Sequence, residues 1–195
     1  MLTLALALVL HASCAQRIVV VAPDARSTVA SLSYLECGRR VFGPWRARVG
    51  YAGVSAHHRE GDGTTPLGTY AIGPTVYGLE PRPPLHLRYH RLVCGDWWDE
   101  DPRSPAYNTF RHVPCGTPPP FGGDSEALWR ATVAYREFAV VEYNAHPVVP
   151  GRGSAIFLHV DTGRATNGCV SLPQAELGEV LRRLRPGATI EIAIA

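Results

Sequence analysis

The stretch that decides the fold of this chain is Ser154-Ala-Ile-Phe-Leu-His159, followed by Thr166-Asn-Gly-Cys169-Val-Ser-Leu172. A histidine ends an apolar run, and a cysteine follows it ten positions later, directly after Gly168. An adjacent base can hold a thiol as thiolate, and glycine lets the backbone turn sharply enough to present it. The pattern therefore indicates Cys169 as a nucleophile and His159 as its base. From spacing alone, the alternative is a disulfide cysteine and a histidine that ends a buried strand.

Two motifs resemble those of one enzyme family. Gly153-Ser-Ala-Ile-Phe-Leu-His159 with Thr166-Asn-Gly-Cys169-Val is similar to the histidine and Ser/Thr-x-Gly-Cys signature of the YkuD-type L,D-transpeptidases. Arg59-Glu-Gly-Asp-Gly-Thr-Thr-Pro-Leu-Gly-Thr-Tyr70 resembles the Gly-Asp-Gly-x-Thr-Pro-x-Gly segment of that family. The motifs occur in the family's order, and the resemblance runs from about Ile18 to the C-terminus.

The resemblance implies cofactor-free and metal-free acyl transfer on peptidoglycan stem peptides. The Cys169 thiolate would attack the carbonyl of the donor's third residue, a diacid, and expel the terminal D-amino acid. An amine of a second stem, or water, would release the thioester, so L,D-transpeptidation and L,D-carboxypeptidation both stay open. His159 would take the thiol proton and return it to the leaving amine, while backbone N–H groups around Asn167 and Gly168 bind the oxyanion.

The chain departs from the commoner family pattern at three positions. Asn167 stands where a histidine often precedes the glycine, and Ser171 stands where an arginine or asparagine often follows the nucleophile by two. Both departures remove polar contacts to substrate that other members can make, and Asn167 itself stays a candidate substrate contact. Val160 follows the histidine where a small or hydroxyl residue is frequent. This third departure predicts that a backbone carbonyl, not a side chain, orients the imidazole.

Other residues near the motifs are candidates for substrate binding. Tyr143 and Asn144 could line the cleft, and a strand-end tyrosine with a turn asparagine describes them equally well. Arg152 and Arg164 could meet a carboxylate of a diacid, although solvated arginines are the favoured interpretation. Asp62 is expected to fix a turn rather than to catalyse.

A metal site is an alternative from another class. His86, His90 and Cys94 recur every fourth residue, which clusters ligands only on a helix. The alternation of apolar and polar residues over 85–90 instead indicates a half-buried strand, on which these side chains lie too far apart for one metal ion. The spacing therefore disfavours zinc.

The cysteines carry a second alternative. Cys94 and Cys115 flank a loop rich in Asp, Pro and Trp, and a disulfide between them suits an oxidising compartment. Cys37 has no obvious partner. In a non-catalytic peptidoglycan-binding protein, Cys169 would form a disulfide, for instance with Cys37, and the cleft would only hold the cell wall.

Composition sets the broad class. The chain has 195 residues, 46% of them hydrophobic and 18% charged, which is typical of one globular domain. Its formal net charge of +2 is too small to indicate nucleic-acid binding, and we expect a monomer. All 19 basic residues are arginine, so Schiff-base and Ser–Lys chemistry have no lysine to carry them.

The N-terminus is typical of a secretory segment. Residues 1–15 contain an apolar run too short to span a bilayer comfortably, followed by small residues, which predicts cleavage near residue 15. We therefore expect an extracytoplasmic protein without a membrane span, whose catalytic domain covers 18–195. Cys14 would leave with the segment or carry a lipid. Lipidation is the less favoured option, because His11 stands where an aliphatic residue is usual.

The remaining chain predicts a mainly β fold. Short β-rich runs alternate with Gly/Pro turns, which indicates a β-sandwich or open barrel with one or two short helices, the fold that the resemblance implies. Residues 94–123 read as a loop and 124–130 as a short helix, while Ser171–Gln174 is a capping box for a helix over 174–184. The predicted strands are 18–22, 28–35, 45–49, 68–72, 85–90, 139–143, 155–159 and 189–194.

Overall fold

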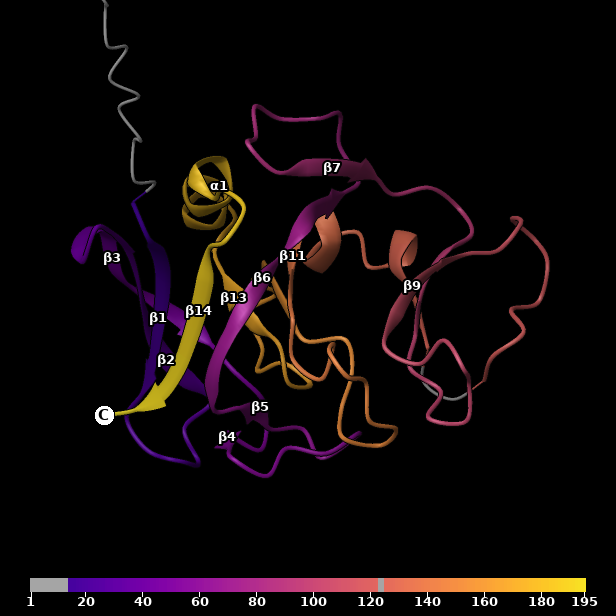
Figure 1. Cartoon of the computed structure of the whole chain (residues 1–195), viewed down its shortest axis with the longest axis horizontal. Helices are drawn as coiled ribbons and strands as arrows, with labels where there is room; N and C mark the ends of the chain where they lie inside the picture. Colours follow the sequence, from indigo (N-terminus) through magenta and orange to yellow (C-terminus); the bar gives the residue numbers. More distant parts are fainter. Residues whose placement is uncertain (1–13, 123–124) are drawn as a thin grey trace, which may run out of the picture.

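Eight strands of the computed structural model close into a mixed barrel (Figure 1). The model describes residues 14–122 and 125–195, so most of the predicted secretory segment lies outside the described residues. The strand order is β11-β12-β13-β3-β2-β1-β14-β6, and β11 pairs back with β6 to close the ring. The predicted mainly β class is confirmed. The barrel strands are β1 (Gln16–Ala22), β2 (Val29–Glu36), β3 (Arg39–Arg48), β6 (Gly68–Gly78), β11 (Glu137–Val141), β12 (Phe157–Val160), β13 (Val170–Leu172) and β14 (Thr189–Ile194).

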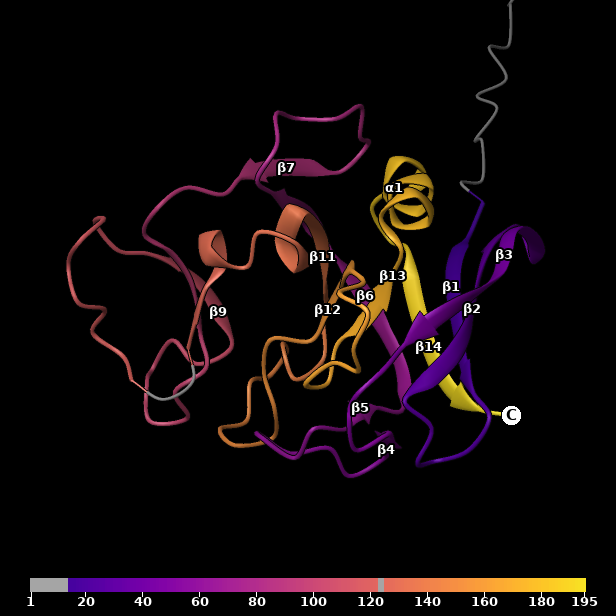
Figure 2. The same cartoon turned by 180° about the vertical axis from the view of Figure 1, so that it is seen from behind.

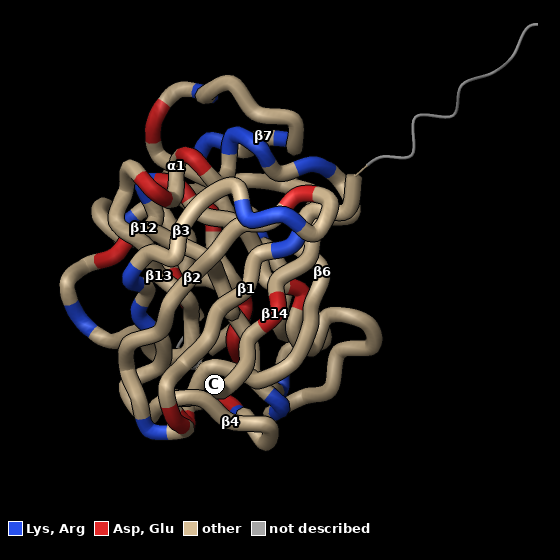
Figure 3. The backbone as a smooth tube through the Cα atoms, turned by 90° about the vertical axis from the view of Figure 1, so that its left-hand side faces the viewer, with Lys and Arg blue, Asp and Glu red and all other residues tan. Residues whose placement is uncertain are grey.

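Alternating apolar residues fill the barrel interior. In β1, Ile18, Val20 and Ala22 are fully buried, because successive strand side chains point to opposite faces. The single α-helix of the described chain, α1 (Gln174–Arg183), lies at one end of the barrel and buries Leu177 there (Figure 1). Charges of both signs are interspersed along the backbone in Figure 3, as expected from the small net charge.

The predicted helix over 174–184 is confirmed, but its capping box is wrong. Ser171 is a buried residue of β13, and the N-cap is Pro173, whose fixed φ of −53° suits a helix start without a side-chain cap. Among the described residues, no helix is long and apolar enough to cross a membrane.

Residues 79–136 form a long excursion between β6 and β11, and it lies beside the barrel in both Figure 1 and Figure 2. Two expectations fail here. The predicted loop over 94–123 contains two strands, and the described part of 124–130 is a strand and a 3₁₀ turn instead of an α-helix. These short strands pair with one another across the excursion, which local sequence cannot reveal. The elements are β7 (Arg88–Arg91), β8 (Asp96–Asp99), β9 (Thr109–His112), β10 (Glu126–Ala127), η1 (Leu128–Arg130) and η2 (Ala134–Arg136).

The excursion covers the outer face of β11 and β12 through a second, aromatic core. Phe138 and Phe157 are fully buried with ring centroids 4.7 Å apart, and Trp98 of the excursion packs edge-on against Phe157 at 5.0 Å. Cys169 belongs to this same cluster. The outer wall of the barrel at β12 and β13 is therefore enclosed rather than solvated.

Two disulfides involve four of the five cysteines. The predicted Cys94–Cys115 bond is present, so the Cys94 sulfur is not available to a metal ion. Cys37, which the sequence leaves without a partner, pairs with Cys14, because antiparallel pairing of β1 with β2 sets Gln16 opposite Glu36 and so brings the two cysteines together. Cys169 is free, and its suggested pairing with Cys37 is wrong.

Removing the bond of the excursion should destabilise the protein. The Cys94→Ser, Cys115→Ser double variant frees a loop with a sequence separation of 21, for which chain entropy predicts a loss of about 3 kcal/mol. Urea unfolding followed by tryptophan fluorescence measures it, with a lower midpoint expected. A midpoint equal to that of the oxidised wild type would contradict the prediction.

Candidate active site

Cys169 and His159 lie on the same outer face of the barrel wall. Strand β12 runs parallel to β13 with His159 opposite Ser171, and Cys169 directly precedes β13. Residues two apart in a strand share a face, so Cys169 and Ser171 lie on the face that also carries His159. Cys169 is 8% exposed and His159 is 6% exposed. The parallel pairing thus brings together the two residues that the sequence singles out.

The Cys169 thiol is held by two backbone groups. The Phe157 N–H donates to Sγ at 3.3 Å, and the thiol donates to the Ala155 carbonyl at 3.2 Å. Burial raises the pKa of the Cys169 thiol well above its ordinary value, and the nearby Glu126 carboxylate raises it further. The thiol is therefore protonated at neutral pH and needs a base to become a nucleophile.

The imidazole of His159 is fixed as a potential base. Its Nδ1 lies 2.8 Å from the Val160 carbonyl oxygen, which can only accept, so Nδ1 carries the proton and Nε2 keeps its lone pair. This confirms that a backbone carbonyl orients the ring. Burial lowers the pKa of His159, so the ring is neutral at neutral pH.

Gly168 is required by the turn that presents Cys169. Its φ is +142°, and a Cβ there would lie 3.0 Å from the Thr64 carbonyl oxygen and 3.2 Å from Ile156 Cδ1. Its N–H donates to Thr166 Oγ1 at 3.2 Å. The preceding Asn167 is exposed and lines the cavity beside the thiol.

The segment that contains the Gly-Asp-Gly motif also anchors this turn. Asp62 accepts the Arg59 N–H and the Thr64 N–H, both at 2.8 Å, which confirms its expected role in a turn. Thr65, in the short strand β5 (Thr65–Pro66) that pairs with β4 (Val54–Ser55), donates from Oγ1 to the Cys169 carbonyl at 3.2 Å. The second motif thus fixes the backbone that carries the thiol.

A cavity of about 270 Å³ opens beside the thiol, between the barrel wall, the 50–64 loop and the excursion. Three glutamates line it: Glu60, Glu100 and Glu126. Burial raises the pKa of Glu126 to about 7, and its carboxylate accepts the Tyr135 hydroxyl. The other lining residues are Tyr51, His58, Gly61, Gly63, Ser154, Ala155, Ile156, Asn167 and Cys169.

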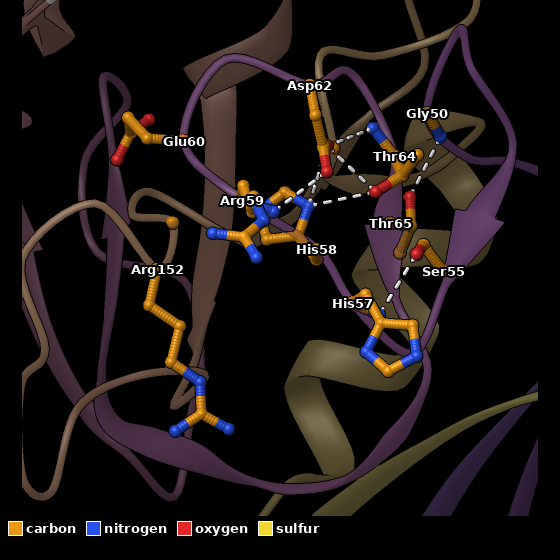
Figure 4. Close-up of polar contacts among 12 residues, drawn as sticks. Gly50, Ser55, His57, His58, Arg59, Glu60, Asp62, Thr64, Thr65 and Arg152 are labelled. Atoms are coloured by element: carbon orange, nitrogen blue, oxygen red, sulfur yellow. Dashed lines mark hydrogen bonds and ion pairs between the residues drawn. The ribbon is translucent and has the colours of Figure 1, made fainter.

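His58 is a site residue that the sequence analysis missed. It lines the thiol's cavity, is 6% exposed, and its Nδ1 lies 3.1 Å from both Asp62 Oδ1 and Thr64 Oγ1 (Figure 4). Burial lowers its pKa despite the nearby carboxylates. The sequence feature that could have indicated His58 is its position four residues before Asp62 of the Gly-Asp-Gly motif.

Two further polar residues join the cavity to the excursion. Glu60 accepts the hydroxyl of Ser154 at 2.6 Å and also the hydroxyl of Tyr107. Asn108 Oδ1 accepts the Ala155 N–H at 3.1 Å and the Trp98 indole N–H at 3.0 Å. No sequence pattern marked the contacts of Ser154 with Glu60 and of Ala155 with Asn108, since these residues lie 94 and 47 positions apart.

Tyr143 and Asn144 hold the loop before β12. The Tyr143 hydroxyl donates to the Arg152 carbonyl at 2.8 Å, and Asn144 Nδ2 donates to the Gly153 carbonyl at 2.8 Å. Tyr143 also lines a second cavity, of about 320 Å³, together with Arg59 and Arg152. Asn144 is absent from the described linings of both cavities.

Replacing Gly153 by alanine should destabilise the protein and displace His58. A Cβ there would lie 2.4 Å from His58 Nε2, and the φ of +115° already disfavours a side chain, so we expect a loss of about 1–3 kcal/mol. The matched control is Gly151→Ala, where φ is +76° but nothing lies within 4 Å of the new Cβ. Urea midpoints compare the two, and equal losses would contradict the predicted clash.

Comparisons with known proteins complete the description. Residues 15–192 match the family model YkuD, described as the L,D-transpeptidase catalytic domain. Among solved structures, the L,D-transpeptidase (Yku) from Stackebrandtia nassauensis is 13% identical over 91% of this chain and 55% of its own, with a TM-score of 0.39. The helical cell shape determining protein Pgp2 from Campylobacter jejuni, in a mutant form, is 13% identical over 93% and 47%, with a TM-score of 0.44. The chain thus spans about half the length of these two proteins. No curated protein matches it.

Proposed function

This chain belongs to the YkuD family of L,D-transpeptidase catalytic domains, and we propose that it transfers acyl groups of peptidoglycan stem peptides through a thioester on Cys169. The observation that carries the proposal is a free thiol on the same wall face as a neutral, carbonyl-oriented imidazole, beside a cavity. A disulfide-bonded cysteine would have favoured the non-catalytic wall-binding alternative.

In the acylation step, His159 Nε2 takes the thiol proton and the Cys169 sulfur attacks the donor carbonyl. The C–N bond to the terminal D-amino acid breaks, and the imidazolium returns its proton to the leaving amine. Backbone N–H groups at Asn167, Gly168 and Cys169 stabilise the oxyanion, the Gly168 N–H being shared with Thr166 Oγ1.

In the second step, an amine or water attacks the thioester, His159 Nε2 takes its proton, and the C–S bond breaks. The proton then returns from the imidazolium to the departing thiolate. An amine of a second stem peptide gives a cross-link, which is L,D-transpeptidation, and water gives L,D-carboxypeptidation. We propose transpeptidation as the main reaction, with a role in cell-wall remodelling and cell shape. Asn167, Tyr143 and Asn144 remain the proposed substrate-side residues, with Asn167 lining the thiol's cavity directly.

The family and the two disulfides support an extracytoplasmic location. We propose a secreted or wall-associated monomer in which residues 1–15 direct export and 18–195 form the catalytic domain. The Cys14–Cys37 disulfide favours cleavage before Cys14 over the predicted cleavage near residue 15, which would remove the partner of Cys37. Lipidation of Cys14 is the disfavoured option, because that sulfur pairs with Cys37.

Incubation with a purified stem tetrapeptide, with and without an acceptor amine, tests the proposal. Mass spectrometry should detect loss of the terminal D-amino acid and, with acceptor present, a cross-linked dimer in excess over the tripeptide. Tripeptide alone would assign the carboxypeptidase reaction. Binding of cell wall without any product would overturn the enzymatic proposal.

The pH dependence of acylation follows from His159. A buried imidazole has a lowered pKa, so it stays unprotonated below its ordinary value of 6.5 and protonates only at more acidic pH. The acylation rate should therefore hold as pH falls to 6.5 and drop only below it. Stopped-flow acylation at several pH values, with circular dichroism as a control for folding, measures this. Half-loss of the rate above pH 6.5 would contradict the assignment.

A further inference from the structure

The second cavity adjoins the thiol's cavity at His58. It has a volume of about 320 Å³, and His58 is the one described residue that lines both cavities. Two arginines and a further histidine line it, and none of its described lining residues is acidic. The lining residues are Ala56, His57, His58, Arg59, Tyr143, Val149, Pro150, Gly151 and Arg152.

The two loops that carry the arginines are fixed to each other. The Arg59 N–H donates to Asp62 Oδ2 at 2.8 Å, and the next N–H, of Glu60, donates to the Gly151 carbonyl at 3.1 Å. The Arg152 carbonyl accepts the Tyr143 hydroxyl at 2.8 Å. The backbone at both arginines is therefore preorganised, and a ligand would need to order only the side-chain ends.

Both guanidinium groups are available to a ligand. Arg59 and Arg152 are exposed, and neither forms an ion pair with any acidic residue in 14–122 or 125–195. Figure 4 shows the Arg59 side chain beside the His58 ring and the Arg152 side chain farther from it, on another loop, and both residues line this cavity. Burial raises the pKa of the Tyr143 phenol, and the nearby Arg152 side chain lowers it.

The charges of the two cavities are opposite. Glu60 and Glu100 line the thiol's cavity and repel a carboxylate there, and Glu126 adds to this repulsion when it is ionised, whereas the arginine cavity attracts a carboxylate. A substrate that carries a carboxylate near its scissile bond is therefore favoured in one orientation, with the carboxylate in the arginine cavity and the scissile bond at the thiol. Guanidinium groups bind carboxylates with paired, charge-assisted hydrogen bonds, so two of them can hold one carboxylate strongly.

We propose that the cavity between Arg59 and Arg152 binds a carboxylate of the acyl-donor peptide while its scissile carbonyl lies at Cys169. This inference rests on the proposed function and adds the two residues that hold a carboxylate of its peptide substrate. Either the side chain of the acyl-donating residue or the C-terminus of the leaving residue can supply that carboxylate.

Binding to the Cys169→Ala protein, which cannot turn over, tests the subsite by calorimetry. The probes are a synthetic stem tetrapeptide with both carboxylates free and two versions amidated at one or the other. One amidation should weaken binding to the protein by about tenfold, and it identifies the bound carboxylate. Arg59→Gln and Arg152→Gln should each weaken binding of the peptide with both carboxylates free by about tenfold. Neither substitution should change the binding of the peptide whose amidation itself weakens binding.

Arg164→Gln is the matched control, because Arg164 is exposed and outside the described lining of both cavities. Equal binding of all three peptides, or an equal effect of Arg164→Gln, would overturn the inference. Acylation of wild-type Cys169 by the same peptides keeps the two ideas separate. If all three peptides acylate Cys169 with the same dependence on peptide concentration, the subsite is wrong and the proposed function stands. If none of the peptides acylates Cys169, the proposed function is wrong whatever the binding result.

Discussion

Cys169→Ala is expected to abolish turnover and covalent acylation while the fold stays intact. Removing a catalytic nucleophile costs about 10⁶-fold in serine proteases, and no other free cysteine exists among the described residues to replace it. The substitution keeps the Cβ and removes only a sulfur that makes two weak backbone contacts. Stability should therefore change little compared with activity.

Intact mass after incubation with a carbapenem, an acylating β-lactam, measures the effect. We expect one adduct on the wild type and none on the variant, with matching circular dichroism spectra. An adduct on the variant, or full activity of the variant, would falsify the nucleophile assignment. A folded wild type that forms no adduct would favour the non-catalytic wall-binding alternative.

His159→Ala should slow acylation by about 10²–10⁴-fold. The neutral imidazole is the proposed acceptor of a proton that the buried thiol otherwise holds tightly, because burial raises the thiol's pKa. Without the base, attack depends on the small thiolate fraction. The residual rate should therefore keep rising with pH into the alkaline range, whereas the wild-type rate should not.

Stopped-flow acylation across the pH range measures both the loss and the changed profile. The control is His86→Ala, since His86 is exposed and belongs to the disfavoured metal set. A His159→Ala enzyme with the wild-type rate and profile would remove His159 from the proposed mechanism. The buried His58, which lines the thiol's cavity, would then be the next base to test.

Local sequence patterns predicted most of the barrel strands but not the short strands of the excursion that packs against the barrel. The strands around Ile18 and Ile190 and the helix after Pro173 follow from alternation and turn residues that are visible locally. Residues 94–130 of the excursion were predicted to be a loop and a helix, because β8, β9 and β10 have four residues or fewer and are stabilised by partners such as Trp98 opposite Phe110. Pairings of this kind leave little periodic signal in the sequence.

The sequence by itself determined the family, the mainly β fold, the Cys94–Cys115 bond and the backbone carbonyl that orients the imidazole, because each depends on residues in a short motif or on simple spacing. Only the tertiary structure decided that Cys37 pairs with Cys14, that Cys169 is free, and that His58 and three glutamates share the thiol's cavity. Those outcomes depend on barrel closure and on loops that meet across long sequence distances. Burial, which raises the pKa of the Cys169 thiol and lowers that of His159, exists only once the excursion covers the wall.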